Sequence, residues 1–176
     1  HLRKRRLAVM ISPQGRAVAR PASRDSRQAG RRGNRGDDMI LHASCIAHRG
    51  RGLLILGPSG AGKSTLALEM MAFGAGLVAD DRTLLRRDGD RIIADSPPAI
   101  RGRIEARRVG ILNARAVGPV PLVLAVDLGQ AETDRLPPRR ELSISLGRLP
   151  LVLGAGHVHL ASTLLQYLEG GRADAD

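Results

Sequence analysis

The stretch GPSGAGKST at residues 57–65 contains the clearest chemical motif of the sequence. Its first eight residues fit the phosphate-binding pattern G-x-x-x-x-G-K-[ST], also called Walker A. The glycines let backbone N–H groups turn toward phosphates, the lysine adds a positive charge, and the serine offers a hydroxyl to Mg²⁺. The motif predicts binding of ATP with Mg²⁺, and leaves open what accepts the phosphoryl group. The predicted nucleotide-binding residues are Gly57, Pro58, Ser59, Gly60, Ala61, Gly62, Lys63, Ser64 and Thr65.

Two adjacent carboxylates form the second chemical feature. The short apolar run GLVADD ends in Asp80 and Asp81, and a strand there would deliver both residues beside the phosphate-binding loop. Neighbouring residues on a strand point to opposite faces, so we expect the two carboxylates to have different roles. In most phosphate-loop ATPases a carboxylate here holds only metal or water. The residues alone therefore leave a general base, a metal ligand and a helix cap as alternatives.

The elements around the loop follow from hydrophobic periodicity. Strands at 39–48 and 51–57 precede the loop, and a helix follows with Leu66, Met70 and Phe73 on one face. An Asp-Gly turn predicts a hairpin within 82–95, whereas Pro97 and Pro98 open a polar loop expected at the rim of the site. The remaining predictions are a buried strand at 120–128, a long polar loop at 129–142 and an amphipathic closing helix at 157–170.

Composition and charge narrow the class of protein. The chain has 176 residues, which suits one catalytic unit, and its formal charge is +11. Residues 1–38 hold eleven Lys or Arg and three Asp, so +8 of this charge lies there. We expect residues 1–38 to be a disordered basic extension and residues 39–176 to be the catalytic domain. The extension could be a polyanion-binding arm, a solvated tail or sequence upstream of a start at Met39.

Several classes of function are disfavoured. Aromatic residues make up only 1 % of the chain, so base stacking on aromatic side chains has little to use, and a nucleic-acid partner is not expected. The single cysteine, Cys45, excludes an internal disulfide. No apolar run approaches the roughly 18 residues of a membrane span. These features predict a soluble, cytoplasmic protein with no membrane contact.

The motifs together resemble the catalytic domain of HPr kinase/phosphorylase, the bacterial enzyme that phosphorylates a serine of the carrier protein HPr. The resemblance rests on LHAS before the loop, the loop itself, ADD at its spacing, and SPPAI followed by IEARRVGIL, and it runs from about Met39 to Leu112. The short form is similar to that of alphaproteobacteria. The family implies an α/β fold of the P-loop kinase, phosphoenolpyruvate-carboxykinase-like class, with a mixed β-sheet and flanking helices.

The resemblance also implies roles for individual residues. Lys63 matches a phosphate contact, Ser64 a Mg²⁺ ligand, and Asp81 the residue that accepts the serine proton. His42 matches an active-site histidine that keeps this aspartate in the needed state; the alternative is a half-buried strand histidine. Two further matches are Glu105, which matches a metal ligand, and Arg135, which matches an active-site arginine. From its place beside Asp81 at the end of GLVADD, we expect Asp80 to be a further metal ligand.

The expected partner is HPr or a nitrogen-type HPr paralogue, and the family implies a homo-oligomer, a hexamer. The closing helix offers an apolar stripe formed by Leu160, Leu164, Leu165 and Leu168. This stripe either docks HPr or packs in the core.

The family loop PVRPGR, tied to dephosphorylation, aligns only with LPLVLGAG, so kinase activity is the firmer expectation. A small-molecule P-loop kinase and a nucleic-acid-associated ATPase using the basic arm remain alternatives.

Overall fold

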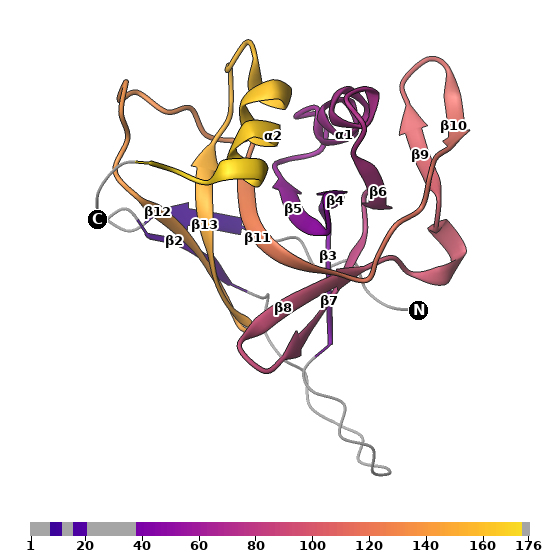
Figure 1. The fold of residues 1–176 in the computed structure, drawn as a ribbon, viewed down its shortest axis with the longest axis horizontal. Helices are drawn as coiled ribbons and strands as arrows, with labels where there is room; N and C mark the ends of the chain where they lie inside the picture. Colours follow the sequence, from indigo (N-terminus) through magenta and orange to yellow (C-terminus); the bar gives the residue numbers. More distant parts are fainter. Residues whose placement is uncertain (1–7, 12–15, 21–37, 174–176) are drawn as a thin grey trace.

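The computed structural model describes residues 8–11, 16–20 and 38–173. They form a mixed α/β fold with a curled sheet and few helices (Figure 1). The α/β class and the mixed sheet agree with the prediction from the sequence. In chain order the elements are β1 Ala8–Ile11, β2 Arg16–Arg20, β3 Met39–Leu41, β4 Ser44–His48, β5 Arg51–Leu56, α1 Lys63–Ala72, β6 Gly76–Ala79, β7 Thr83–Asp88, β8 Arg91–Asp95, the 3₁₀ turn η1 Pro98–Ile100, β9 Arg103–Ala106, β10 Gly110–Asn113, β11 Val120–Asp127, β12 Arg140–Ile144, β13 Gly147–Leu153 and α2 Leu160–Gly170.

Strand β11 links the two parts of the sheet. The main path runs β1-β2-β12-β13-β11-β5-β4-β6, with β11 parallel to both β5 and β13. The first residues of β11 pair instead with β8, which continues through β7 to β3. The sheet therefore curls, and β3, β7 and β8 lie across the face of the main path that is opposite to the helices (Figure 1).

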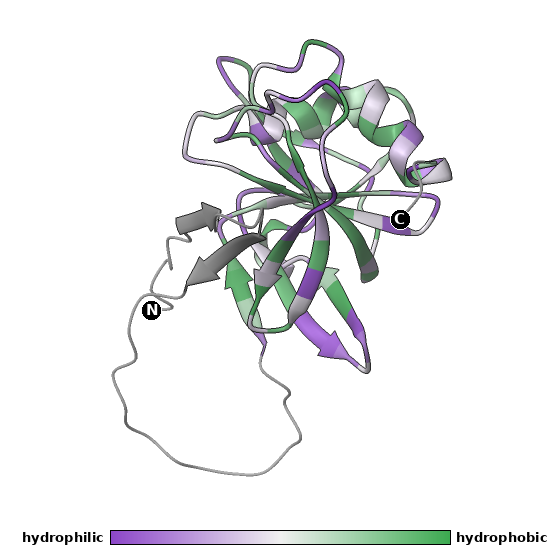
Figure 2. Cartoon of the chain, turned by 90° about the vertical axis from the view of Figure 1, so that its left-hand side faces the viewer, coloured by the Kyte–Doolittle hydropathy of each residue, from purple (hydrophilic) through white to green (hydrophobic). Residues whose placement is uncertain are grey.

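Two hydrophobic clusters hold these layers together. One lies between the main strands and the β3-β7-β8 part, and includes Leu41, Leu54 and Leu85. The other lies between the main strands and the two helices, and includes Leu53, Met70 and Leu164. Apolar residues follow the central strands in Figure 2, whereas hydrophilic residues gather at the exposed ends. Burial of aliphatic side chains, with almost no aromatic contribution, is what stabilises the fold.

The apolar stripe of α2 is part of the core. Its four leucines are at most 9 % exposed and pack in the helix-side cluster. The docking alternative for this stripe is therefore wrong, because the side chains that would meet a partner are already covered by the chain itself.

We expect Leu164→Ala to lower the free energy of unfolding by about 2–5 kcal/mol, because it empties part of a fully buried site. Urea denaturation followed by circular dichroism measures this change, and Gln166→Ala, at an exposed position of the same helix, serves as the control. A Leu164→Ala protein of unchanged stability that had lost affinity for a protein partner would restore the docking interpretation.

Several predicted elements differ from those observed. Segment 39–48 forms two strands, because β3 pairs with β7 while β4 pairs with β5 and β6. The polar segment 96–112 contains η1 and the β9–β10 hairpin, since Ile104 and Ala106 alternate with polar residues and are buried. Strands β12 and β13 were not predicted. Phe73 follows α1 and is 64 % exposed, so only Leu66 and Met70 of the predicted face are buried.

Two short stretches of residues 1–38, for which we expect disorder from the sequence, are described as strands. Strands β1 and β2 pair with each other, and β2 adds in parallel to the free edge of β12. An edge strand offers unpaired backbone groups, so a short segment can join it through main-chain hydrogen bonds despite weak apolar periodicity. Residues 1–7, 12–15 and 21–37 lie outside the described residues.

Candidate active site

The phosphate loop, residues 57–64, connects β5 to α1 as the motif demands. Gly60 and Gly62 have φ values of 84° and 95°, a conformation in which glycine avoids the strain of a side chain. Helix α1 begins at Lys63, with no side-chain cap and no acidic residue in its first turn. Its first N–H groups and the positive end of its dipole are therefore available to an anion at the loop.

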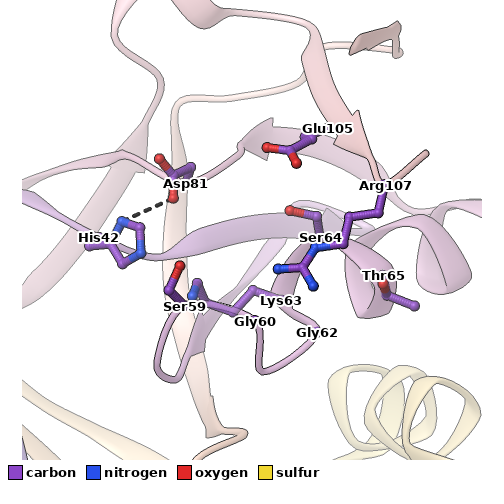
Figure 3. A pocket seen from close by; sticks show the side chains of 10 residues that line it. All are labelled: His42, Ser59, Gly60, Gly62, Lys63, Ser64, Thr65, Asp81, Glu105 and Arg107. Atoms are coloured by element: carbon purple, nitrogen blue, oxygen red, sulfur yellow. Dashed lines mark ion pairs between the residues drawn. The ribbon is translucent and has the colours of Figure 1, made fainter. Parts of the chain in front are cut away.

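A cavity of about 160 Å³ opens over this loop (Figure 3). The loop glycines, Ser59 and Thr65 form one wall, and side chains from three other parts of the chain face them. These are His42 from the β3–β4 connection, Asp81 after β6, and Glu105 and Arg107 from the β9–β10 hairpin. The structure thus brings together residues that the sequence separates by more than sixty positions.

Lys63 is held inside the loop. Its side chain is 7 % exposed, and its Nζ donates hydrogen bonds to the backbone oxygens of Gly57, at 3.0 Å, and Pro58, at 3.1 Å. Burial lowers the pKa of Lys63 below its ordinary value, while the negative charges of Asp81 and Asp80 act in the opposite direction. The ammonium group is therefore positioned before any phosphate binds, and it stabilises the loop itself.

Asp80 lies beneath the cavity, with both carboxylate oxygens in hydrogen bonds. Its Oδ1 accepts from the hydroxyls of Ser44, at 2.8 Å, and Ser64, at 2.7 Å, and its Oδ2 accepts from the backbone N–H of Glu105, at 3.0 Å. These three partners come from β4, α1 and β9. Asp80 therefore fixes the positions of the groups around it, although it does not line the cavity.

Asp81 projects into the cavity instead. Its carboxylate is 54 % exposed, and its Oδ1 lies 2.9 Å from Nδ1 of His42, the contact drawn as a dashed line in Figure 3. Its backbone has a φ of 62°, a region that non-glycine residues visit rarely and that is enriched at functional sites. Strand β6 ends at Ala79, so a bend rather than the alternation of a strand separates the two carboxylates.

Ser64 and Glu105 provide oxygen ligands suited to Mg²⁺. The Ser64 hydroxyl uses its proton on Asp80, which leaves its oxygen lone pairs directed elsewhere. Mg²⁺ takes one or two protein carboxylates plus phosphate oxygens and water, and this donor set fits it. Within the described residues, no group of three His, Cys, Asp or Glu side chains forms a complete metal site. The assignment of Ser64 and Glu105 to a metal site stays a prediction.

Two residues outside the predicted set belong to this group. Arg107 lines the cavity, and its guanidinium lies 3.4 Å from where a Cβ on Gly60 would be. Arg107 lies in the stretch IEARRVGIL, but nothing in the sequence indicated that its side chain reaches the phosphate loop. Ser44, the last residue of the LHAS stretch, contacts Asp80, although nothing in that stretch indicated this contact.

Arg135 lies apart from the other predicted residues. It lines a second cavity, of about 860 Å³, between the segment after β11 and helix α2. This chain alone therefore does not bring Arg135 to the phosphate loop.

The described part of the chain contains no helix of the length and apolarity that a membrane crossing requires.

Comparisons with known proteins agree with this geometry. The family model of the HPr Serine kinase C-terminal domain matches residues 36–120. The chain is 39 % identical to the HPr kinase/phosphorylase of Aromatoleum aromaticum, over 63 % of this chain and 40 % of that protein. It is 36 % identical to the HPr kinase/phosphorylase of an Azoarcus species, over 68 % of this chain and 44 % of the relative.

A solved structure extends the match to the fold. The HPr(Ser) kinase/phosphatase from Coxiella burnetii superposes with a TM-score of 0.67 and 25 % identity, covering 74 % of this chain and 94 % of that one. The chain spans less than half the length of the curated relatives it matches. The matched segment contains His42, the phosphate loop, Asp80, Asp81 and Glu105. The matched segment, residues 36–120, therefore belongs to the family of HPr serine kinase C-terminal domains.

Proposed function

We propose that this chain transfers the terminal phosphoryl group of ATP to a serine hydroxyl of HPr or of a nitrogen-type HPr paralogue. The observation that carries the proposal is the position of Asp81, which faces the phosphate-loop cavity and contacts His42. A carboxylate in that position can receive a proton from a hydroxyl that approaches the bound nucleotide. Membership of the family supports HPr as the protein that supplies this hydroxyl.

The phosphates of ATP bind at the loop in this proposal. Backbone N–H groups of the loop and of the first turn of α1 donate to phosphate oxygens, and Lys63 adds its positive charge. Arg107 faces the loop from the opposite wall and neutralises charge on the outer phosphates. Ser64 and Glu105 would hold Mg²⁺, which neutralises negative charge on the phosphates when it is bound. Asp80 keeps the Ser64 hydroxyl and the Glu105 backbone in place.

Proton transfer is the task of Asp81. As the serine oxygen forms its bond to phosphorus, the bond between phosphorus and the leaving oxygen of ADP breaks and the hydroxyl proton passes to Asp81. The His42 imidazole, 2.9 Å away, fixes the direction of the carboxylate. Because Asp81 is half exposed, an acceptor carried by another protein can reach it.

The shape of the site favours a protein acceptor. A cavity of about 160 Å³ is small beside the 300–1,000 Å³ of typical small-molecule sites, so a bound nucleotide would extend beyond it toward the surface. The β9–β10 hairpin at its rim exposes the apolar side chains of Val109, at 74 %, and Ile111, at 65 %, which a protein acceptor can contact.

The segment aligned with the dephosphorylation loop lies mostly within strand β13, which favours the forward reaction over the reverse one.

We expect purified chain, ATP and Mg²⁺ to convert HPr to a form heavier by one phosphoryl group, at a serine identified by mass spectrometry. HPr with that serine replaced by alanine is the control and should stay unmodified. Parallel reactions with sugars and nucleosides test the small-molecule alternative. Consumption of ATP with one of these, and none with HPr, would overturn the proposed acceptor.

The finer classification forms part of the same proposal. A phosphate loop between β5 and α1, in a mixed sheet with helices on one face, supports the P-loop kinase, phosphoenolpyruvate-carboxykinase-like class. A reaction between ATP and a carrier protein belongs in the cytoplasm. The family supports a homo-oligomer, a hexamer by resemblance, as the assembly.

A further inference from the structure

Ser44 contacts both carboxylate residues of the site through one hydroxyl group. Its Oγ donates to Asp80 Oδ1 at 2.8 Å and accepts from the backbone N–H of Asp81 at 3.3 Å. The directions follow from chemistry, because an ionised carboxylate only accepts and a backbone N–H only donates. Ser44 is fully buried, so water does not compete for these hydrogen bonds.

The register of the sheet places Ser44 there. Strand β4 is antiparallel to β6, and the pair Cys45–Ala79 makes Ser44 the neighbour of Asp80 at the point where β6 ends. The two preceding residues contact the same segment: His42 contacts Asp81, and the Ala43 backbone oxygen accepts from the hydroxyl of Thr83 at 2.8 Å. Residues 42–44 therefore hold residues 80–83 from one side.

Each bond of Ser44 supports a different part of the site. The Asp80 oxygen that accepts from Ser44 also accepts from Ser64, so the Ser44 bond helps fix the direction of the Ser64 hydroxyl. The Asp81 N–H belongs to a residue at a φ of 62°, which costs free energy that surrounding contacts must offset. The bond to Ser44 is one such contact, and it fixes the backbone that aims the Asp81 carboxylate.

We propose that Ser44 is a positioning residue that couples the metal side of the site, through Asp80 and Ser64, to the proton-accepting side, through Asp81. This inference rests on the proposed function for the meaning of the two sides. A single substitution at Ser44 should therefore change the magnesium requirement and the turnover together, although the side chain touches neither nucleotide nor acceptor.

The test is Ser44→Ala, which removes one oxygen atom and both hydrogen bonds. We expect the Mg²⁺ concentration for half-maximal binding of a fluorescent ATP analogue to rise, and kcat for HPr phosphorylation to fall, each by roughly 10- to 100-fold, the usual effect of losing a partner behind a metal ligand. Affinity for the analogue without Mg²⁺ should match that of the wild type, because the phosphate loop and Lys63 are unchanged.

Cys45→Ala is the matched control. It removes one atom from the next residue of the same strand, and the thiol is also fully buried, with a single weak bond to the Ile46 backbone oxygen and no contact with either carboxylate. Melting temperatures separate a loss of packing from a loss of positioning. Cys45→Ala should keep the wild-type magnesium requirement and kcat even if its melting temperature falls.

Two outcomes overturn the inference: a Ser44→Ala protein with wild-type magnesium requirement and kcat, or equal changes in both variants that follow their melting temperatures. The magnesium titration needs no acceptor protein. If wild-type chain fails to phosphorylate HPr, the proposed function fails, whereas the difference between Ser44→Ala and Cys45→Ala in magnesium-dependent binding still decides the role of Ser44 toward Asp80.

Discussion

Replacing Asp81 with asparagine should reduce phosphorylation of HPr by roughly 10²- to 10⁴-fold, the usual contribution of a general base. The amide keeps the size of the side chain and can still hydrogen-bond to His42, but it cannot accept the serine proton. Asparagine also tolerates the positive φ of this position as well as aspartate does, so the backbone should not move. The measurement is the single-turnover rate of phosphoserine formation at saturating ATP.

Nucleotide binding separates this interpretation from its rivals. Binding of a fluorescent ATP analogue should survive Asp81→Asn, because Lys63, Ser64 and Glu105 remain. Asp80→Asn should behave differently. The amide NH₂ would face a hydroxyl or N–H donor that the Asp80 carboxylate now accepts from, so the variant should need more Mg²⁺ and be less stable. Loss of nucleotide binding in Asp81→Asn, or a wild-type rate, would show that Asp81 is not the base. Asp88→Asn, at the exposed end of β7, controls for the loss of one surface charge.

Replacing Lys63 with methionine should abolish labelling of HPr, with a loss of at least roughly 10²-fold, the effect of removing one preorganised donor from a site of developing charge. Methionine keeps the unbranched stem that fills the loop and removes only the ammonium group. Alanine would also empty the buried space, and Lys63 contacts the loop backbone as well as any ligand. Labelling with radioactive ATP measures the transfer directly.

The fold should withstand this change. Burial lowers the pKa of Lys63, against the opposing charges of Asp81 and Asp80, because the ammonium group loses hydration inside the loop. Removing the charge removes the free-energy cost of its desolvation, and this gain offsets part of the stability lost with the two hydrogen bonds to Gly57 and Pro58. Arg91→Met, at an exposed site that does not line the cavity, is the matched control and should label HPr normally. Labelling by Lys63→Met at the wild-type rate would remove the phosphate loop from the mechanism.

The elements next to the phosphate loop were predictable because their information is local. A strand of aliphatic residues, a glycine-rich turn and a helix beginning at Lys63 need no distant contact to be recognised. The turn between β7 and β8 was predictable for the same reason, since Asp-Gly favours a tight hairpin. Asp81 and His42 were assigned by resemblance, and the structure adds their mutual contact.

What the sequence could not show depends on register and curling. Ser44 meets Asp80 only because Cys45 pairs with Ala79, and no short pattern encodes that pairing. The prolines and arginines of 96–112 suggested a loop, although the alternation in Arg103–Ala106 was a sign of the strand that became β9. Arg135 was assigned to the site by resemblance although it lies beyond Leu112, where the main resemblance ends, and in the structure it lines another cavity.

The contacts between residues 42–44 and residues 80–83 limit how this gene can change in length. Side chains on a strand alternate between faces, so one codon gained or lost in either segment would turn Ser44 or Asp80 away from its partner. The turn at residues 89–90 and the segment between β11 and β12 carry no such contact with residues 80–83, and they can lengthen or shorten without disturbing it. Insertions and deletions in diverging copies should therefore collect in those connections, while the two contact segments are inherited as units of constant length.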